Sequence, residues 1–297
     1  MASQISWDLY RSFLSVLKEG SFSGAARALG IAQPTVGRHI AALERALHIP
    51  LFTRSQTGLL PTEAAVALKT HVESMQGIAA AIERTAAGQG EGVRGVVRVT
   101  ASELIGVEVL PGVLARLQAQ HPELTVELVV TNRVQDLLHR DADIAVRTAP
   151  PQQKALVARR IGRIEVGFHA RKDYVARYGT PKNMADLSRH RLIGFDEVTA
   201  YIRDAGRAVP AFRREAFAMR TDSDLAQLAL LRAGAGIGVC QVPIALRADN
   251  LERVLPKVSL YLETWIAMHE DLRHNPSCRV TFEALAEGMQ QHIAAAG

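Results

Sequence analysis

The chain has 297 residues, 48% hydrophobic and 22% charged, the balance of a soluble globular protein with room for two or three domains. Its formal net charge of +5 is compatible with a nucleic-acid partner but does not prove one. The only cysteines, Cys240 and Cys278, exclude a disulfide framework and a multi-cysteine metal site, and we expect two small buried residues rather than a redox pair.

Two short helices joined by a tight turn are predicted within residues 21–47. Gly30 can end the first helix, and Pro34 suits the first turn of the second because its missing N–H would have no partner there. Apolar residues recur at three and four positions on the inner faces: Ala25, Ala26 and Leu29, then Val36, Ile40, Leu43 and Leu47. This pattern predicts a helix-turn-helix, whose second helix enters the major groove of DNA.

Short apolar pieces around a polar tip follow over residues 49–62 and predict a two-stranded wing. Polar side chains at the start of the second helix project outward, and Arg54 in the wing is expected to bind a phosphate. The side chains expected to contact DNA are Ser23, Gln33, Pro34, Thr35, Arg38, His39 and Arg54.

Several separated pieces of this region resemble the N-terminal domain of LysR-type transcriptional regulators. They are Gln33-Pro34, Leu43-Glu44, Pro-Leu-Phe-Thr-Arg at residues 50–54 and Pro-Thr-Glu-Ala at residues 61–64. The alternative is plain helical packing with a solvated face of arginines. The order and spacing of the four pieces favour the DNA-binding interpretation, because agreement between separate signals is stronger than one motif.

Three residues depart from the family pattern. Gly37 replaces a Ser or Thr in the second helix, which removes a hydroxyl and weakens the helix by up to about 1 kcal/mol. Ala32 replaces the usual capping Ser, so capping is left to Gln33 or water. Thr57 replaces a second wing arginine, which should lower the salt dependence of DNA binding by about one phosphate contact.

A long helix is predicted over residues 62–88, between a DNA-binding domain at residues 1–61 and an effector-binding domain at residues 89–297. Its apolar residues form a heptad seam: Ala65, Leu68, Val72, Met75, Ala79, Ile82 and Ala86. We expect this helix to pair with a second copy as a coiled coil, the alternative being that it lies on its own domain. The glycines at residues 88–92 predict a hinge.

Strands and helices alternate beyond the hinge and predict α/β layers around a mostly parallel sheet. Expected strands cover residues 93–100, 124–130, 140–147, 164–169, 192–195, 216–220 and 236–240, and expected helices cover residues 110–120, 173–178, 224–233 and 276–293. This order of strands and helices resembles the two-lobed, periplasmic-binding-protein-like effector domain of LysR-type regulators. The resemblance implies lobe I at about residues 93–161 and 266–297 and lobe II at about residues 162–265.

Ligands of open α/β sheets bind beyond the carboxyl ends of the strands. By the family resemblance, the candidate effector ligands at these strand ends are Ser102, Thr131, Asn132, Arg147, Phe195, Asp222 and Ser223. Each has a structural alternative: Ser102 and Ser223 as helix caps, and Arg147 as an ion pair with Asp141 or Asp143.

The expected function is therefore sequence-specific transcriptional regulation of a dyad-symmetric promoter site, modulated by a small-molecule effector. The expected assembly is a homodimer or homotetramer, with RNA polymerase as a candidate partner. No cofactor or metal is expected, and no catalytic residue, since enzyme motifs are missing from the sequence. A ligand-independent architectural DNA binder and, more remotely, an α/β enzyme are the alternatives. Without a readable signal peptide or spanning segment, we expect a cytoplasmic, nucleoid-associated protein.

Overall fold

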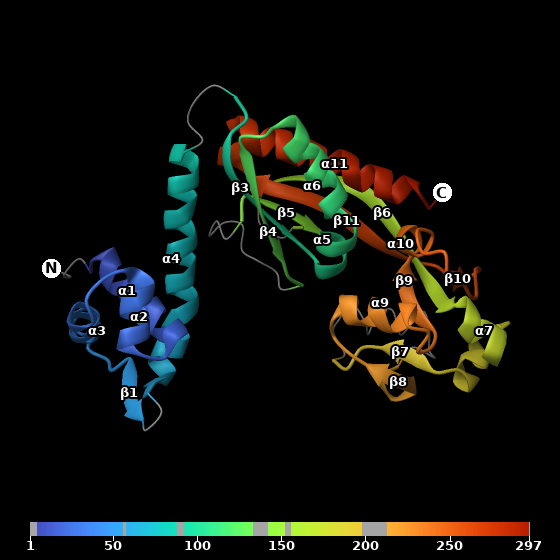
Figure 1. The fold of residues 1–297 in the computed structure, drawn as a ribbon, viewed down its shortest axis with the longest axis horizontal. Helices are drawn as coiled ribbons and strands as arrows, with labels where there is room; N and C mark the ends of the chain where they lie inside the picture. Colours follow the sequence, from blue (N-terminus) through green and yellow to red (C-terminus); the bar gives the residue numbers. More distant parts are fainter. Residues whose placement is uncertain are drawn as a thin grey trace. The chain divides into compact units, whose positions relative to one another are not determined.

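The structure is a computed structural model that describes residues 5–55, 58–87, 92–132, 142–151, 156–197 and 213–296. The described chain falls into two compact units, the first ending at Thr85 and the second beginning at Ala86. Each unit has a hydrophobic core of its own. Figure 1 shows their helices and strands. Thr57 and most of the predicted hinge lie outside the described residues.

The first unit contains three short helices, a wing and a long helix (Figure 1). They are α1 (Trp7–Glu19), α2 (Phe22–Leu29), α3 (Gln33–Leu47), β1 (Phe52–Ser55), β2 (Gly58–Pro61) and α4 (Glu63–Ala87). The helix-turn-helix and the antiparallel wing are confirmed, and α1 is an element that the sequence analysis missed. Its buried face includes the polar Ser12 and Ser15, which blur an apolar periodicity.

The caps of α2 and α3 explain where these helices begin and end. The Ser21 side chain accepts from the amide of Gly24 at the start of α2, and Gly30 ends α2 in the left-handed region with a φ of 67°. Ala32 precedes α3 without a side-chain cap, as its methyl group requires. Pro34 occupies the first turn of α3, so the weak cap is partly offset by a residue that needs no N–H partner.

The predicted seam of α4 has two different halves. Ala65 and Val72 are buried in the core of the first unit, where the half-buried Leu68 also packs. Met75 is 40% exposed and Ile82 is 63% exposed. The alternative that the helix lies on its own domain therefore holds for its first half, whereas Met75 and Ile82 of the second half are exposed.

A seven-stranded sheet forms the centre of the second unit, in the order β10-β6-β11-β5-β3-β4, with β9 also paired to β6. The strands are β3 (Gly95–Ala101), β4 (Leu124–Val130), β5 (Ile144–Arg147), β6 (Leu156–Arg171), β9 (Gly238–Gln241), β10 (Leu251–Arg253) and β11 (Leu260–His269). Among the described strands of this sheet, β3 pairs in parallel with β4 and β5 and the other four pairings are antiparallel, so the expectation of a mostly parallel sheet is wrong. The sheet is mixed because β6 and β11 pair antiparallel along most of their length.

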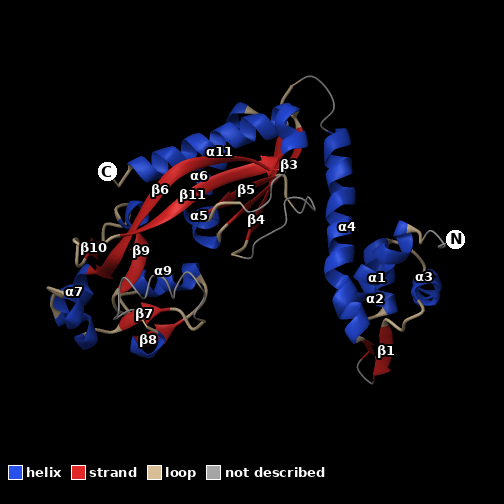
Figure 2. Ribbon diagram, turned by 180° about the vertical axis from the view of Figure 1, so that it is seen from behind, coloured by secondary structure: helices blue, strands red, loops and turns tan. Residues whose placement is uncertain are grey.

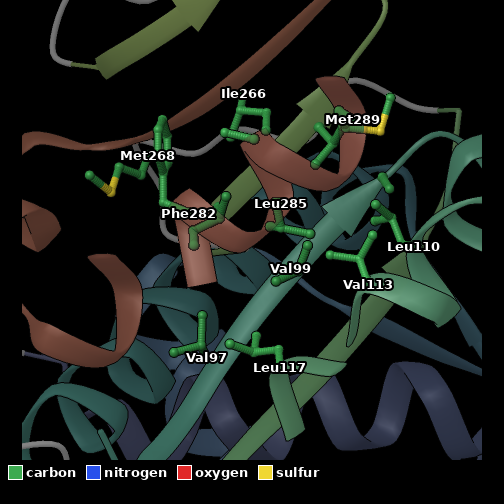
Figure 3. Packing of buried hydrophobic residues seen from close by; sticks show 14 of the residues in the cluster. Val97, Val99, Leu110, Val113, Leu117, Ile266, Met268, Phe282, Leu285 and Met289 are labelled. Atoms are coloured by element: carbon green, nitrogen blue, oxygen red, sulfur yellow. The ribbon is translucent and has the colours of Figure 1, made fainter. Parts of the chain in front are cut away.

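The α-helices described in the first lobe of this unit are α5 (Glu103–Glu108), α6 (Leu110–Gln120) and α11 (Pro276–Ala294), the last preceded by a 3-10 helix (Glu270–His274). Figure 2 shows α11 running alongside β6 and β11. Figure 3 shows the apolar side chains of α6 and α11, including Leu117 and Leu285, packed with those of β3 and β11. These contacts form the core that holds one face of the sheet.

The second lobe contains a small parallel sheet of β7 (Leu192–Gly194) and β8 (Phe217–Arg220). The helices described in this lobe are α7 (Lys172–Tyr178), α9 (Asp224–Arg232), α10 (Val242–Ala245) and two 3-10 helices (Met184–Arg189 and Arg214–Ala216). The chain passes between the lobes within β6 and β11, which are continuous (Figure 2). A register shift between Thr264 and Trp265 lies beside the predicted lobe boundaries at residues 161–162 and 265–266.

Candidate nucleic-acid interface and ligand site

The first turns of α3 present polar side chains outward. Val36, Ile40 and Leu43 are buried in the domain core, so the residues between them face solvent. Of the predicted DNA contacts, Gln33, Pro34 and Arg38 are exposed on α3, Thr35 is half-buried, and Ser23 is exposed on α2. Arg38 Nη2 donates to Thr35 Oγ1 over 3.3 Å, so the guanidinium is held beside the start of the helix.

His39 differs from the other predicted DNA contacts on α3. Its Nδ1 lies 2.7 Å from Oγ of Ser12, a residue of α1 that is only 1% exposed. One ring nitrogen is therefore engaged inside the domain, which favours a role in packing α3 against α1. The partner is 27 residues away in sequence, so no local pattern in α3 could have indicated it.

The wing is anchored at both of its strands. Glu44 on α3 accepts through Oε1 from the backbone amides of Leu51, over 2.7 Å, and Phe52, over 3.3 Å, at the start of β1. The amide of Leu59 on β2 donates to the carbonyl of Gly20 over 3.1 Å. Exposed Arg54 lies opposite Leu59 in the hairpin, so its backbone position is fixed relative to α3. In the sequence, Glu44 is marked only by the Leu43-Glu44 motif, which does not indicate this contact.

In the second unit, predicted effector ligands lie where strands of the first lobe end. Thr131 and Asn132 directly follow β4, and Arg147 is the last residue of β5. Ser102 precedes α5, but its side chain does not cap that helix. Arg147 Nη2 donates to Thr100 Oγ1 over 2.7 Å, and Arg147 Nη1 donates to the carbonyl of Val146 over 3.1 Å.

The alternative role of Arg147, an ion pair with Asp141 or Asp143, can be examined for Asp143. Asp143 Oδ2 accepts from the backbone amide of Arg98 over 2.8 Å, and no ion pair joins it to Arg147. The other candidate, Asp141, lies outside the described residues.

Two of the predicted ligands instead connect the lobes. Ser223 Oγ, at the N-cap of α9, donates to Glu103 Oε2 over 2.9 Å. The Asn132 carboxamide accepts from the amide of Glu103 over 3.0 Å and donates to Asp224 Oδ2 over 3.2 Å. These residues lie just after β4, at the start of α5 and at the start of α9, and together they close a hydrogen-bonded ring across the two lobes.

A second polar contact joins α5 and α9. Arg232 donates to both carboxylate oxygens of Glu108 over 2.7 Å, a forked geometry that favours specific alignment. This pairing holds the pKa of Glu108 below its usual range. The pKa of Asp224 shifts the other way, because burial raises it and nearby Glu103 adds like-charge repulsion. The lobe contact therefore contains one compensated and one poorly compensated carboxylate.

Phe195 and Asp222 lie elsewhere in the second lobe. Asp222 Oδ1 accepts from the amides of Asp196, over 3.0 Å, and Glu197, over 2.9 Å, so this carboxylate orders its own loop. Phe195 is half-buried and packs against the hydrophobic core of that lobe. Neither of these contacts joins Phe195 or Asp222 to Arg147 or Asn132.

Three further ionisable side chains of the second unit are buried, and burial disfavours the charged form of each. Burial lowers the pKa of His169 to about 4 and, together with Arg247, the pKa of His292 to about 4. Burial raises the pKa of the Cys240 thiol to about 12, so thiolate chemistry at neutral pH is disfavoured there. Among the described residues, no group of three or more His, Cys, Asp and Glu side chains is arranged to hold a metal ion. The helices that the structure describes include none long and apolar enough for a membrane span.

Two family models match the chain. A model described as bacterial regulatory helix-turn-helix protein, lysR family, matches residues 7–66, and a model described as LysR substrate binding domain matches residues 90–290. The first match covers α1 to the start of α4, and the second begins before β3 and continues into α11.

Curated relatives belong to the same kind of regulator, and a solved structure has the same fold. An HTH-type transcriptional regulator of Xanthomonas campestris pv. campestris (strain 8004) is 32% identical over 184 residues, a match that spans 61% of this chain and 53% of that regulator. The HTH-type transcriptional activator AaeR of Escherichia coli (strain K12) is 27% identical over 255 residues, covering 82% of this chain and 81% of AaeR. The crystal structure of full-length CbnR complexed with its target DNA has the same fold, with a TM-score of 0.68, 18% identity, and coverage of 98% of this chain and 100% of CbnR.

Proposed function

The chain belongs to the LysR family of transcriptional regulators, with an N-terminal helix-turn-helix DNA-binding domain and a C-terminal effector-binding domain, and from this premise we propose which side chains perform each task. The family binds DNA and small-molecule effectors and forms oligomers. The family and the relatives are regulators rather than enzymes.

The proposed DNA-reading surface is the outward side of the first turns of α3. Gln33, Pro34, Thr35 and Arg38 approach the major groove, while Arg54 in the wing binds a phosphate. The observation that carries this assignment is the exposure of Arg38 beside the start of a helix whose opposite face is buried. Ser23 on α2 supplies a further phosphate contact. His39 orients α3 through Ser12 and approaches DNA only with its other ring edge.

The proposed ligand response acts through the lobes of the second unit. A small-molecule effector binds at the strand ends near Ser102, Thr131 and Arg147, and changes the ring that Asn132 and Ser223 form across the lobes. Phe195 and Asp222 shape the loop of the second lobe. An effector shifts the equilibrium only if it prefers one lobe arrangement, so binding energy must differ between the two.

The exposed second half of α4 supports a homodimer, with a tetramer as the larger alternative. Met75 and Ile82 present an uncovered apolar stripe that a second copy of the helix would bury. A two-fold dimer places two recognition helices on a dyad-symmetric promoter site, with half-sites about one helical turn apart. We place this assembly on the chromosome in the cytoplasm, with RNA polymerase as the candidate partner at the promoter.

Substitution of Arg38 tests the DNA assignment. DNA fragments are selected from the source genome with the full chain at low salt, and affinity is measured by fluorescence anisotropy. Arg38→Ala should bind about 5–100-fold more weakly, the range expected for one lost base contact. Arg54→Ala should reduce the salt dependence by about one phosphate contact.

The matched control is Arg45→Ala. Arg45 is also exposed on α3, but it lies near the end of that helix, where Nε donates to the carbonyl of Ala41. Its loss should change affinity less than about twofold beyond the general charge effect. If Arg38→Ala binds as tightly as the wild type while Arg45→Ala does not, the DNA-facing end of α3 has been assigned incorrectly.

A further inference from the structure

Half-buried arginines of the described chain are paired with carboxylates, with Arg147 as the exception. The half-buried arginines are Arg98, Arg147, Arg171, Arg232 and Arg253. The pairs are Arg98–Glu127, Arg171–Asp173, Arg232–Glu108 and Arg253–Glu165. No carboxylate among the described residues forms an ion pair with Arg147. Its acceptors are two neutral oxygens, Thr100 Oγ1 and the carbonyl of Val146.

This lack of a counter-ion is costly for a side chain so deeply placed. Burial lowers the pKa of Arg147 to about 10, a large shift for a guanidinium. A buried charge is tolerated when an oppositely charged group lies beside it. A buried charge without such a partner is typical of a ligand-binding site. Thr100 is 0% exposed and holds one end of the guanidinium, so the group is oriented rather than free to turn to water. The Nε–H is not used in either of these bonds.

A second unused donor lies next to Arg147. Trp265 on β11 is directly opposite Arg147 on β5 in an antiparallel pairing, so the two side chains leave the same face of the sheet. The indole Nε1 is buried and has no hydrogen-bond partner in the part of the chain that the structure describes. Buried donors are nearly always satisfied in folded proteins. Two neighbouring donors, and no ion pair of Arg147 with a carboxylate of the described residues, therefore point to an acceptor supplied from outside the chain.

The start of α9, another place where an anion could bind, already has hydrogen-bond partners within the chain. Ser223 at the start of α9 donates to the Glu103 carboxylate, and Asp224 beside it carries negative charge of its own. Asp222 orders its own loop. An anionic group would be repelled at α9 and attracted at Arg147.

We propose that the effector is a small carboxylic acid whose carboxylate docks on Arg147, with the Trp265 indole N–H as a second donor. The inference rests on the proposed effector response of this regulator and specifies its chemistry. A guanidinium presents parallel N–H groups that match the two oxygens of a carboxylate, and one positive charge balances one negative charge. Thr100 is a positioning residue, because it orients the guanidinium.

The test compares acids with their neutral amides on the full chain. The thermal unfolding midpoint Tm is measured with acetate, butyrate and benzoate against acetamide, butyramide and benzamide, at fixed pH and ionic strength. At least one acid should raise Tm by about 2–4 °C near ten times its Kd, while its amide has no comparable effect. Sodium phosphate and sulfate form a separate arm for other oxyanions.

Two variants assign the response to its residues. Arg147→Met should abolish the difference between acid and amide, and Trp265→Phe, which removes the N–H but keeps an aromatic ring, should reduce it. Arg98→Met is the matched control, because Arg98 is half-buried in the same sheet but paired with Glu127. It should keep the response.

Equal stabilisation by acid and amide in the wild type, or no stabilisation by any acid, would overturn the proposal without any variant. So would a full response in Arg147→Met, or a response to phosphate and sulfate alone. DNA binding is measured in parallel by anisotropy. If the wild type responds to acids but binds no DNA, only the proposed regulator function is refuted. If it binds DNA but responds equally to each acid and its amide, only the proposed carboxylate effector is refuted.

Discussion

Gly37 leaves room on the recognition helix that another residue could fill. A Cβ atom built at this position would be 4.0 Å from the nearest ring carbons of Phe22, which is ordinary contact. Its backbone lies outside the left-handed region, so the position is not one that requires glycine. Glycine therefore lowers the stability of α3 without a steric reason.

We expect Gly37→Ala to stabilise the first unit by up to about 1 kcal/mol, because alanine loses less backbone freedom on folding and favours a helix interior. The measurement is chemical denaturation followed by circular dichroism. Gly30→Ala is the control: space is also open there, but a φ of 67° should make alanine destabilising. An equal change of the same sign at both positions would contradict this explanation.

Residues that face solvent in a local pattern could be predicted, and residues with distant partners could not. The exposure of Arg38 follows from the spacing of α3 alone. The engagement of His39 with Ser12, and of Ser223 with a glutamate 120 positions away, depends on contacts that no local spacing encodes. The sequence correctly predicted that Asn132 follows a strand and that Ser223 precedes a helix. It did not predict the hydrogen bonds that these residues form across the lobes.

The wing and the recognition helix are coupled elements. Glu44 accepts from two backbone amides at the start of the hairpin, those of Leu51 and Phe52, so α3 directly supports the start of β1. Loss of these hydrogen bonds should therefore displace Arg54, although neither of them involves Arg54 itself.

Glu44→Ala should therefore destabilise the wing by about 1–3 kcal/mol, the cost of leaving partly buried amides unsatisfied. Hydrogen exchange at the Leu51 and Phe52 amides measures the effect. Glu44→Gln retains the Oε1 acceptor and should restore most of the protection. An exposed glutamate of α4, Glu83, is a suitable alanine control. Unchanged protection in Glu44→Ala would show that water replaces the carboxylate.

Element boundaries were predicted well where a single periodicity covers a complete element. The helix at residues 110–120 and the strand at residues 124–130 agree with α6 and β4. The heptad spacing predicted the length of α4 but not what its apolar residues pack against. The first half of that apolar stripe packs in the core of its own domain. The long strand β6 was only partly predicted, since its arginine-rich beginning lacks an apolar alternation; those arginines pair with Glu283 and Glu263.

At the scale of the whole molecule, two buried histidines link stability to pH. His169 is 2% exposed and His292 is 7% exposed, and the pKa of each is lowered to about 4. A histidine with a lowered folded pKa binds its proton more readily in the unfolded chain. Its contribution to stability is therefore complete above about pH 6.5 and is lost as the pH falls toward 4.

We expect the free energy of unfolding of the second unit to fall by up to about 3 kcal/mol per histidine across this range. Urea denaturation at several pH values measures the slope. His292→Gln keeps a donor for the Gln241 carboxamide, 3.0 Å away, and should make the slope shallower by about one proton. His274→Gln, at an exposed position, should leave the slope unchanged. A slope that His292→Gln does not alter would assign the acid sensitivity to other groups.

The continuity of β6 and β11 also constrains the order in which the second unit folds. Arg160 and Trp265 are cross-strand neighbours, although the whole second lobe lies between them in sequence. Their pairing must close a very long loop, and loop closure becomes more costly in entropy as the free chain lengthens. Once the second lobe is compact, its ends emerge side by side and most of that loop is no longer free. The second lobe is thus the expected nucleus, and the central sheet of the first lobe is completed last.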